Sequence, residues 1–107
     1  MGVLGVNPLI EQRRNELEEL CRRFRVRRLE LFGSAARADF DPATSDLDFL
    51  VELEDLEPVA CADAYFGLLE SLEDLFGRRV DLVVPSAVRN PYFLQAISGG
   101  RVTLYAA

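Results

Sequence analysis

The 107-residue sequence contains no histidine, no lysine and no tryptophan. The absence of histidine excludes Ser-His-Asp triads, zinc sites built on imidazole and imidazole general bases. The two cysteines, Cys21 and Cys61, form no CxxC motif. We expect both to be reduced, buried thiols, which is typical of a cytoplasmic protein. Any catalysis must therefore depend on carboxylates, hydroxyls, arginine and bound metal.

Long apolar runs are also lacking. None approaches the ~18–20 residues that span a bilayer, and residues 1–10 lack the basic region of a secretory signal. We therefore expect no membrane association. The composition, 50% hydrophobic and 28% charged, is that of a globular protein, and the length predicts a single domain over residues 1–107.

The sequence has fewer positive than negative side chains. It contains twelve arginines and eighteen acidic residues, so the net charge is −6. This negative net charge argues against a protein whose main function is to bind nucleic acid directly through its phosphates. Residues 39–81 contain thirteen acidic residues, and their only basic residues are Arg78 and Arg79. The acidic segment is where we expect the chemistry.

Hydrophobic periodicity and turn signals predict helices and strands in alternation. The order predicts an α+β fold, a mixed four-stranded sheet with helices mainly on one face. On the long central helix, the expected core residues include the aromatic pair Tyr65 and Phe66. The predicted helices cover 8–24, 58–76 and 91–97, the strands cover 28–32, 46–53, 79–84 and 101–105, and the other core positions of the long helix are Ala62, Leu69, Leu72 and Phe76.

Three aspartates are predicted to share one face of the sheet. Asp46 and Asp48 are two residues apart on a strand, so their side chains project to the same side, with Cα atoms roughly 6–7 Å apart. Asp81 alternates with apolar neighbours and also faces away from the core. A hard divalent cation relieves the repulsion among such carboxylates, and Mg²⁺ combines carboxylates with phosphate oxygens. The pattern favours phosphoryl or nucleotidyl transfer, although an isolated Asp-x-Asp is commonly a pair of solvated charges.

The order of motifs is more specific than any one of them. A strand ends in Gly33-Ser34, an ordered loop leads to the Asp-x-Asp strand, and a helix leads to the strand with Asp81. The segments LFGSAARADFDPATSDLDFLVE and VDLVV resemble the nucleotidyltransferase superfamily typified by DNA polymerase β. Within it, the chain is similar to the minimal nucleotidyltransferases, the antitoxin partners of HEPN-domain ribonucleases. The resemblance implies a polymerase β palm-like fold.

The resemblance also implies roles for individual residues. It makes Asp46, Asp48 and Asp81 the catalytic residues and the ligands of two Mg²⁺ ions, with Asp81 able to deprotonate the acceptor hydroxyl. Arg37 either faces a phosphate or pairs with Asp39 and shapes the loop. The residues implied to bind the nucleotide are Gly33, Ser34, Arg37 and Ser45.

The implied activity is transfer of AMP from ATP to a hydroxyl, in particular a tyrosine of a partner HEPN toxin. Two alternatives stay open at this point. One is adenylylation of a small molecule of the aminoglycoside type, which a homodimer would favour. The other is an inhibitory antitoxin whose catalytic site has decayed, because the loop from Ser34 to Asp46 is longer than usual in the family and has Ala38 where glycine is common.

Overall fold

The computed structural model describes residues 8–32, 46–84 and 102–106, which form three helices and four strands. The predicted loop 34–45 and helix 91–97 lie outside the described residues. No helix in the described ranges has the length and apolar character needed to cross a membrane. In chain order the elements are α1 (Pro8–Gln12), α2 (Arg14–Arg23), β1 (Val26–Phe32), β2 (Leu47–Leu53), α3 (Pro58–Phe76), β3 (Val80–Val83) and β4 (Val102–Ala106).

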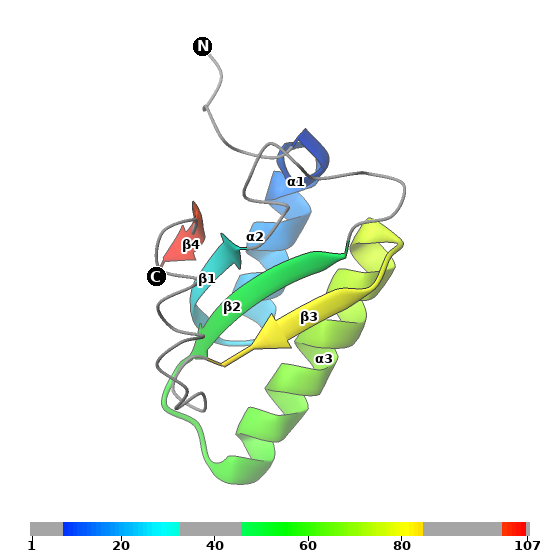
Figure 1. The fold of residues 1–107 in the computed structure, drawn as a ribbon. Coiled ribbons are helices and arrows are strands. Elements are labelled where there is room, and N and C mark those ends of the chain that lie inside the picture. The colour runs from blue at the N-terminus through cyan, green and yellow to red at the C-terminus, as the bar shows by residue number, and fades with distance from the viewer. Residues whose placement is uncertain (1–7, 33–45, 85–101, 107) are drawn as a thin grey trace, which may run out of the picture.

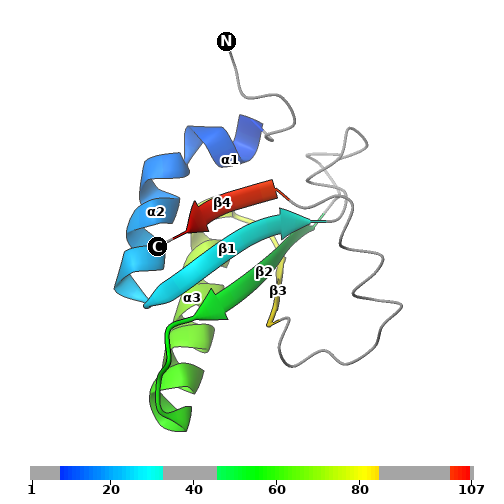
Figure 2. The ribbon, with the colours of Figure 1, turned by 90° about the vertical axis from the view of Figure 1, so that its left-hand side faces the viewer.

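The four strands form one mixed sheet in the order β3-β2-β1-β4. The central strand β1 pairs antiparallel with β2 and with β4, whereas β2 and β3 run parallel. Parallel neighbours require a crossover connection, and α3 supplies it. The helices lie on one face of the sheet (Figures 1 and 2). The predicted α+β architecture is confirmed.

The strict alternation of β2 divides its residues between two faces. Leu47, Phe49 and Val51 are fully buried in the main core between the sheet and the helices. Leu50 points to the opposite face and is buried there in a small second cluster with Phe32 and Val83. We call this opposite face the open face of the sheet. Because Asp48 and Glu52 share the parity of Leu50, both belong to the open face.

Helix α3 begins at Pro58 and ends before Gly77, as the sequence predicts. Gly77 adopts φ +63°, the left-handed conformation that a glycine tolerates at the end of a helix. The predicted core face of α3 is only partly right, because Ala62 is exposed and Phe66 is 64% exposed. Adjacent residues on a helix point about 100° apart, so Tyr65 and Phe66 cannot both face the sheet. The residues of α3 that are buried are Ala64, Leu68, Leu72 and Phe76.

The predicted helix 8–24 is in fact two helices that meet at Arg13. The Arg13 N–H donates to the carbonyl of Ile10 at 3.0 Å, a three-residue turn that closes α1. A continuous helix would place Arg13 and Arg14 between the buried side chains of Ile10 and Leu17 on the core side. With the break, Ile10 and Leu17 are buried, Arg13 is exposed and Arg14 is half-buried.

Candidate active site

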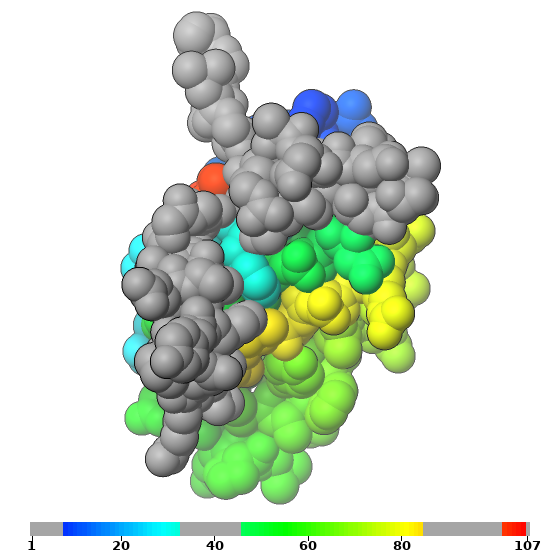
Figure 3. Space-filling model, in the orientation of Figure 1, coloured from blue at the N-terminus to red at the C-terminus, as the bar shows by residue number. Residues whose placement is uncertain are grey.

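Two of the three predicted aspartates are direct neighbours in the sheet. In the parallel register of β2 and β3, Asp48 is the partner of Asp81. Their strands are about 4.8 Å apart, as paired strands are. Both carboxylates lie on the open face, since the residues that flank them belong to the main core. Asp48 is half-buried and Asp81 is exposed. The predicted proximity of this pair is confirmed, and Figure 3 shows atoms of β2 and β3 at the surface.

Asp46 lies just before β2 rather than within it, and it is exposed. The ladder between β2 and β3 begins at the pair Leu47 and Val80, so no strand pairing fixes the direction of Asp46. Within the described ranges, no three side chains of Asp, Glu and Cys come together as a group of metal ligands. The expected convergence of all three aspartates is therefore not found. The backbone brings together the pair Asp48 and Asp81, and like charges favour separated side chains.

The carboxylate pair borders a hollow of about 360 Å³ at the β3 edge of the sheet. We call it the aspartate hollow. Phe32 and Val83 line it from the open face, and Tyr65 and Leu69 line it from α3. The apolar wall can pack against the apolar part of a ligand. The two carboxylates can bind a metal ion that also binds a polar group of that ligand. The remaining lining residues are Asp48, Val80, Asp81 and Leu82.

A buried carboxylate, Glu30, lies elsewhere on the open face and was not anticipated from the sequence. It is 6% exposed on the central strand β1. Its Oε2 accepts hydrogen bonds from Arg28 Nε and from Thr103 Oγ1, both at 3.2 Å. The bond from Arg28 lies within β1, whereas the bond from Thr103 connects β1 to β4. Because both bonds are made to the buried carboxylate, the burial of Glu30 has a structural explanation. The signal for it in the sequence is the spacing of Arg28, two residues earlier on the same face.

The residues predicted to bind the nucleotide, Gly33, Ser34, Arg37 and Ser45, lie outside the described residues, and their roles stay predictions. Chain connectivity nevertheless relates them to the aspartates. Gly33 directly follows Phe32, and Phe32 is the register partner of Asp48. Strand β1 therefore ends beside Asp48, one residue before Gly33 in the sequence.

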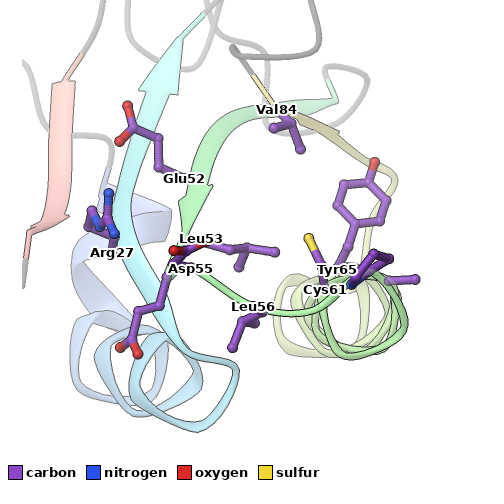
Figure 4. A pocket seen from close by; sticks show the side chains of 11 residues that line it. Arg27, Glu52, Leu53, Asp55, Leu56, Cys61, Tyr65 and Val84 are labelled. Atoms are coloured by element: carbon purple, nitrogen blue, oxygen red, sulfur yellow. The ribbon is translucent and has the colours of Figure 1, made fainter.

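A larger hollow of about 730 Å³ lies at the other end of β2 (Figure 4). Leu53, Leu56 and Cys61 line it, together with Tyr65, which also borders the aspartate hollow. None of the three aspartates lines this larger hollow. Its size therefore does not make it the active site, because it lacks the carboxylate pair that the chemistry needs.

Comparison with known proteins decides the family. The model of the nucleotidyltransferase domain family matches residues 13–103, which includes all three aspartates. The chain belongs to this family. A protein of Thermococcus cleftensis named protein adenylyltransferase MntA is 38% identical over 73 residues, which cover 68% of this chain and 70% of that protein. The predicted membership of the nucleotidyltransferases is confirmed, and with it the class of enzyme.

Solved structures of toxin–antitoxin proteins share the fold. One, described as a toxin-antitoxin with AMP-PNP, aligns with a TM-score of 0.65 at 22% identity and covers 88% of this chain and 73% of that chain. Another, described as a tri-AMPylated Shewanella oneidensis HEPN toxin in complex with MNT antitoxin, aligns with a TM-score of 0.62 at 22% identity. It covers 91% of this chain and 72% of that chain. The likeness confirms the predicted polymerase β-like fold of the minimal nucleotidyltransferases.

Proposed function

We propose that this nucleotidyltransferase uses Mg²⁺ to transfer AMP from ATP to a tyrosine hydroxyl of a HEPN-type toxin, and that it is the toxin's antitoxin in the cytoplasm. The observation that carries the proposal is the register pair of Asp48 and Asp81 on the open face. The name of the Thermococcus relative and the AMPylated toxin in the Shewanella complex support the choice of reaction and partner.

The carboxylates fit Mg²⁺ by their chemistry, because it prefers hard oxygen ligands and takes a few carboxylates together with phosphate oxygens. Asp48 and Asp81 would hold the ion, and Asp46, exposed at the start of β2, would join them. A Mg²⁺ ion held there would neutralise charge on the triphosphate and lower the pKa of the acceptor hydroxyl.

In the transfer, the acceptor oxygen attacks the α-phosphorus of ATP. A new P–O bond forms to the acceptor while the bond between the α-phosphorus and pyrophosphate breaks, so pyrophosphate leaves with that electron pair. The acceptor proton passes to a carboxylate, for which Asp81 is suited because it is exposed beside its partner Asp48. The Gly33-Ser34 turn would hold the triphosphate through backbone N–H groups and the Ser34 hydroxyl.

A protein acceptor agrees with the exposure of Asp81 and with the place of the pair near the β3 edge of the sheet. Pockets for small ligands bury ~70–90% of the ligand surface, whereas the aspartate hollow, as far as the described residues line it, is open to solvent. A tyrosine on a docked protein needs no such enclosure, because the docking surface of that protein positions it. The net charge of −6 favours a basic partner, which an RNA-cleaving toxin is expected to be.

The test incubates the chain with Mg²⁺, ATP labelled at the α-phosphate and a HEPN-type toxin from the same organism. We expect label on a tyrosine of that protein with the wild type and with the control Asp63→Asn, which changes an exposed aspartate on α3. With Asp48→Asn, labelling should fall by at least ~10²-fold. Efficient labelling of an aminoglycoside in place of the protein would favour the small-molecule alternative. Toxin inhibition without any labelling would favour the decayed antitoxin.

A further inference from the structure

Strand β3, which carries Asp81, is a short edge strand of four residues. Among the strands that the structure describes, it pairs with β2 alone. In a parallel pair, backbone groups of alternate residues point toward the same neighbour. The Leu47 N–H donates to the carbonyl of Arg79 at 3.2 Å, so the backbone of Arg79 points toward β2. By alternation, the backbone groups of Val80 and Leu82 point away from β2, toward the outer edge of the sheet.

Helix α3 satisfies these outward groups with two side chains. The Tyr65 hydroxyl donates to the carbonyl oxygen of Leu82 at 2.5 Å. The Val80 N–H donates to Glu73 Oε2 at 3.3 Å. Asp81 is the one residue between these two contacts. The outer edge of β3 is therefore bonded to α3 on both sides of the predicted metal ligand, while β2 bonds its inner edge.

We propose that Tyr65 and Glu73 are positioning residues that set the place of Asp81 relative to Asp48, and so determine how tightly the site holds its metal. This inference rests on the proposed function, because it takes the pair as metal ligands. Both act through the backbone of β3 and not by contact with the metal.

Packing holds the Tyr65 ring in place and thereby fixes the position of the hydroxyl that bonds Leu82. Tyr65 is half-buried against the main core and packs edge-on against Phe66, with ring centroids 5.0 Å apart and an interplanar angle of 87°. The ring also lines the aspartate hollow beside both carboxylates. Removal of the hydroxyl alone should keep this packing and release only the carbonyl of Leu82. Groups that hydrogen-bond directly to metal ligands commonly contribute about 10–100-fold to metal affinity or activity, and we take the lower end of this range for bonds that act through the backbone.

The experiment measures Mn²⁺ binding to the full chain by electron paramagnetic resonance, with Mn²⁺ in place of Mg²⁺, and follows folding by the melting temperature in EDTA. The variants are Tyr65→Phe and Glu73→Met, which each remove one bond to β3. Glu73→Gln keeps a side-chain oxygen that can accept the Val80 N–H. The matched control is Tyr105→Phe, which removes a tyrosine hydroxyl from β4 at the opposite edge of the sheet.

We expect Tyr65→Phe and Glu73→Met to weaken Mn²⁺ binding about tenfold. Glu73→Gln and Tyr105→Phe should bind Mn²⁺ as the wild type does. Wild-type affinity in Tyr65→Phe and Glu73→Met would overturn the inference. If Tyr65→Phe does not fold, the difference between Glu73→Met and Glu73→Gln decides. Asp81→Asn separates the two claims, since undiminished Mn²⁺ binding in that variant would refute the proposed metal site itself.

Discussion

Replacement of Gly67 by alanine tests how closely α3 packs against the end of α2. Gly67 lies inside α3 and faces Phe24, the residue that follows α2. A Cβ atom built on Gly67 would lie 2.5 Å from Phe24 Cε1 and 3.2 Å from Cδ1 and Cζ. Carbon atoms in good contact are about 3.5–4.0 Å apart, so the ring would have to move. The glycine therefore permits the approach of the two segments.

Two opposing effects set the magnitude for Gly67→Ala. Alanine in a helix interior is more stable than glycine by about 1 kcal/mol. Overpacking a filled site costs about 1–3 kcal/mol. Because the nearest contact is far below the normal separation, we expect overpacking to dominate and Gly67→Ala to destabilise the fold by about 1 kcal/mol. For a domain of this size, that lowers the melting temperature by about 4–8 °C.

Urea unfolding followed by circular dichroism measures this free energy in two backgrounds. In a Phe24→Leu variant the ring is absent, so the helix preference should dominate and Gly67→Ala should stabilise by up to about 1 kcal/mol. The sign of the effect should thus reverse between the backgrounds. Equal stabilisation by Gly67→Ala in both would refute the close contact between α3 and Phe24.

Two further predictions concern charge. Asp81→Asn removes the charge repulsion between Asp81 and its cross-strand neighbour Asp48. In EDTA it should therefore raise the free energy of unfolding by about 0.2–1 kcal/mol, whereas the exposed control Asp63→Asn should not. A loss of stability only in Asp81→Asn would contradict this prediction. Burial, with a smaller effect of Glu18, raises the pKa of the Cys21 thiol from 9.0 to about 12. The unfolded chain then loses this proton near pH 9 while the folded chain keeps it, so the stability contribution is full below pH 9 and is lost between about pH 9 and 12. The urea midpoint of the wild type should fall more steeply with pH over this range than that of Cys21→Ala. Equal slopes for the two proteins would show that ionisation of Cys21 does not affect stability.

Local signals in the sequence were sufficient for most of the fold. The alternation of β2 identified its buried face, and Pro58 and Gly77 marked the ends of α3. The side of α3 that faces the sheet was harder to predict, because apolar residues occur on more than one side of the helix. Phe66 was therefore assigned to the core, although it is exposed. Only the sheet determines which side of such a helix is covered.

The candidate site was predictable to the extent that it depends on strand parity. Parity placed Asp48 and Asp81 on one face, and the register then made them partners. It could not fix Asp46, which precedes the first paired residue of the strand. The contacts of Tyr65 and Glu73 with β3 had no signal in the sequence. They depend on the packing of α3 along an edge strand, which is a long-range property of the fold.

The position of the bound metal would show whether Asp48 and Asp81 form the active site. A crystal of the wild-type chain with Mn²⁺ and a non-hydrolysable ATP analogue would locate Mn²⁺ by its anomalous scattering. We expect the metal to be bound by one carboxylate oxygen of Asp48 and one of Asp81, together with phosphate oxygens of the nucleotide. Metal bound to the nucleotide without either aspartate, or bound at another surface, would contradict it.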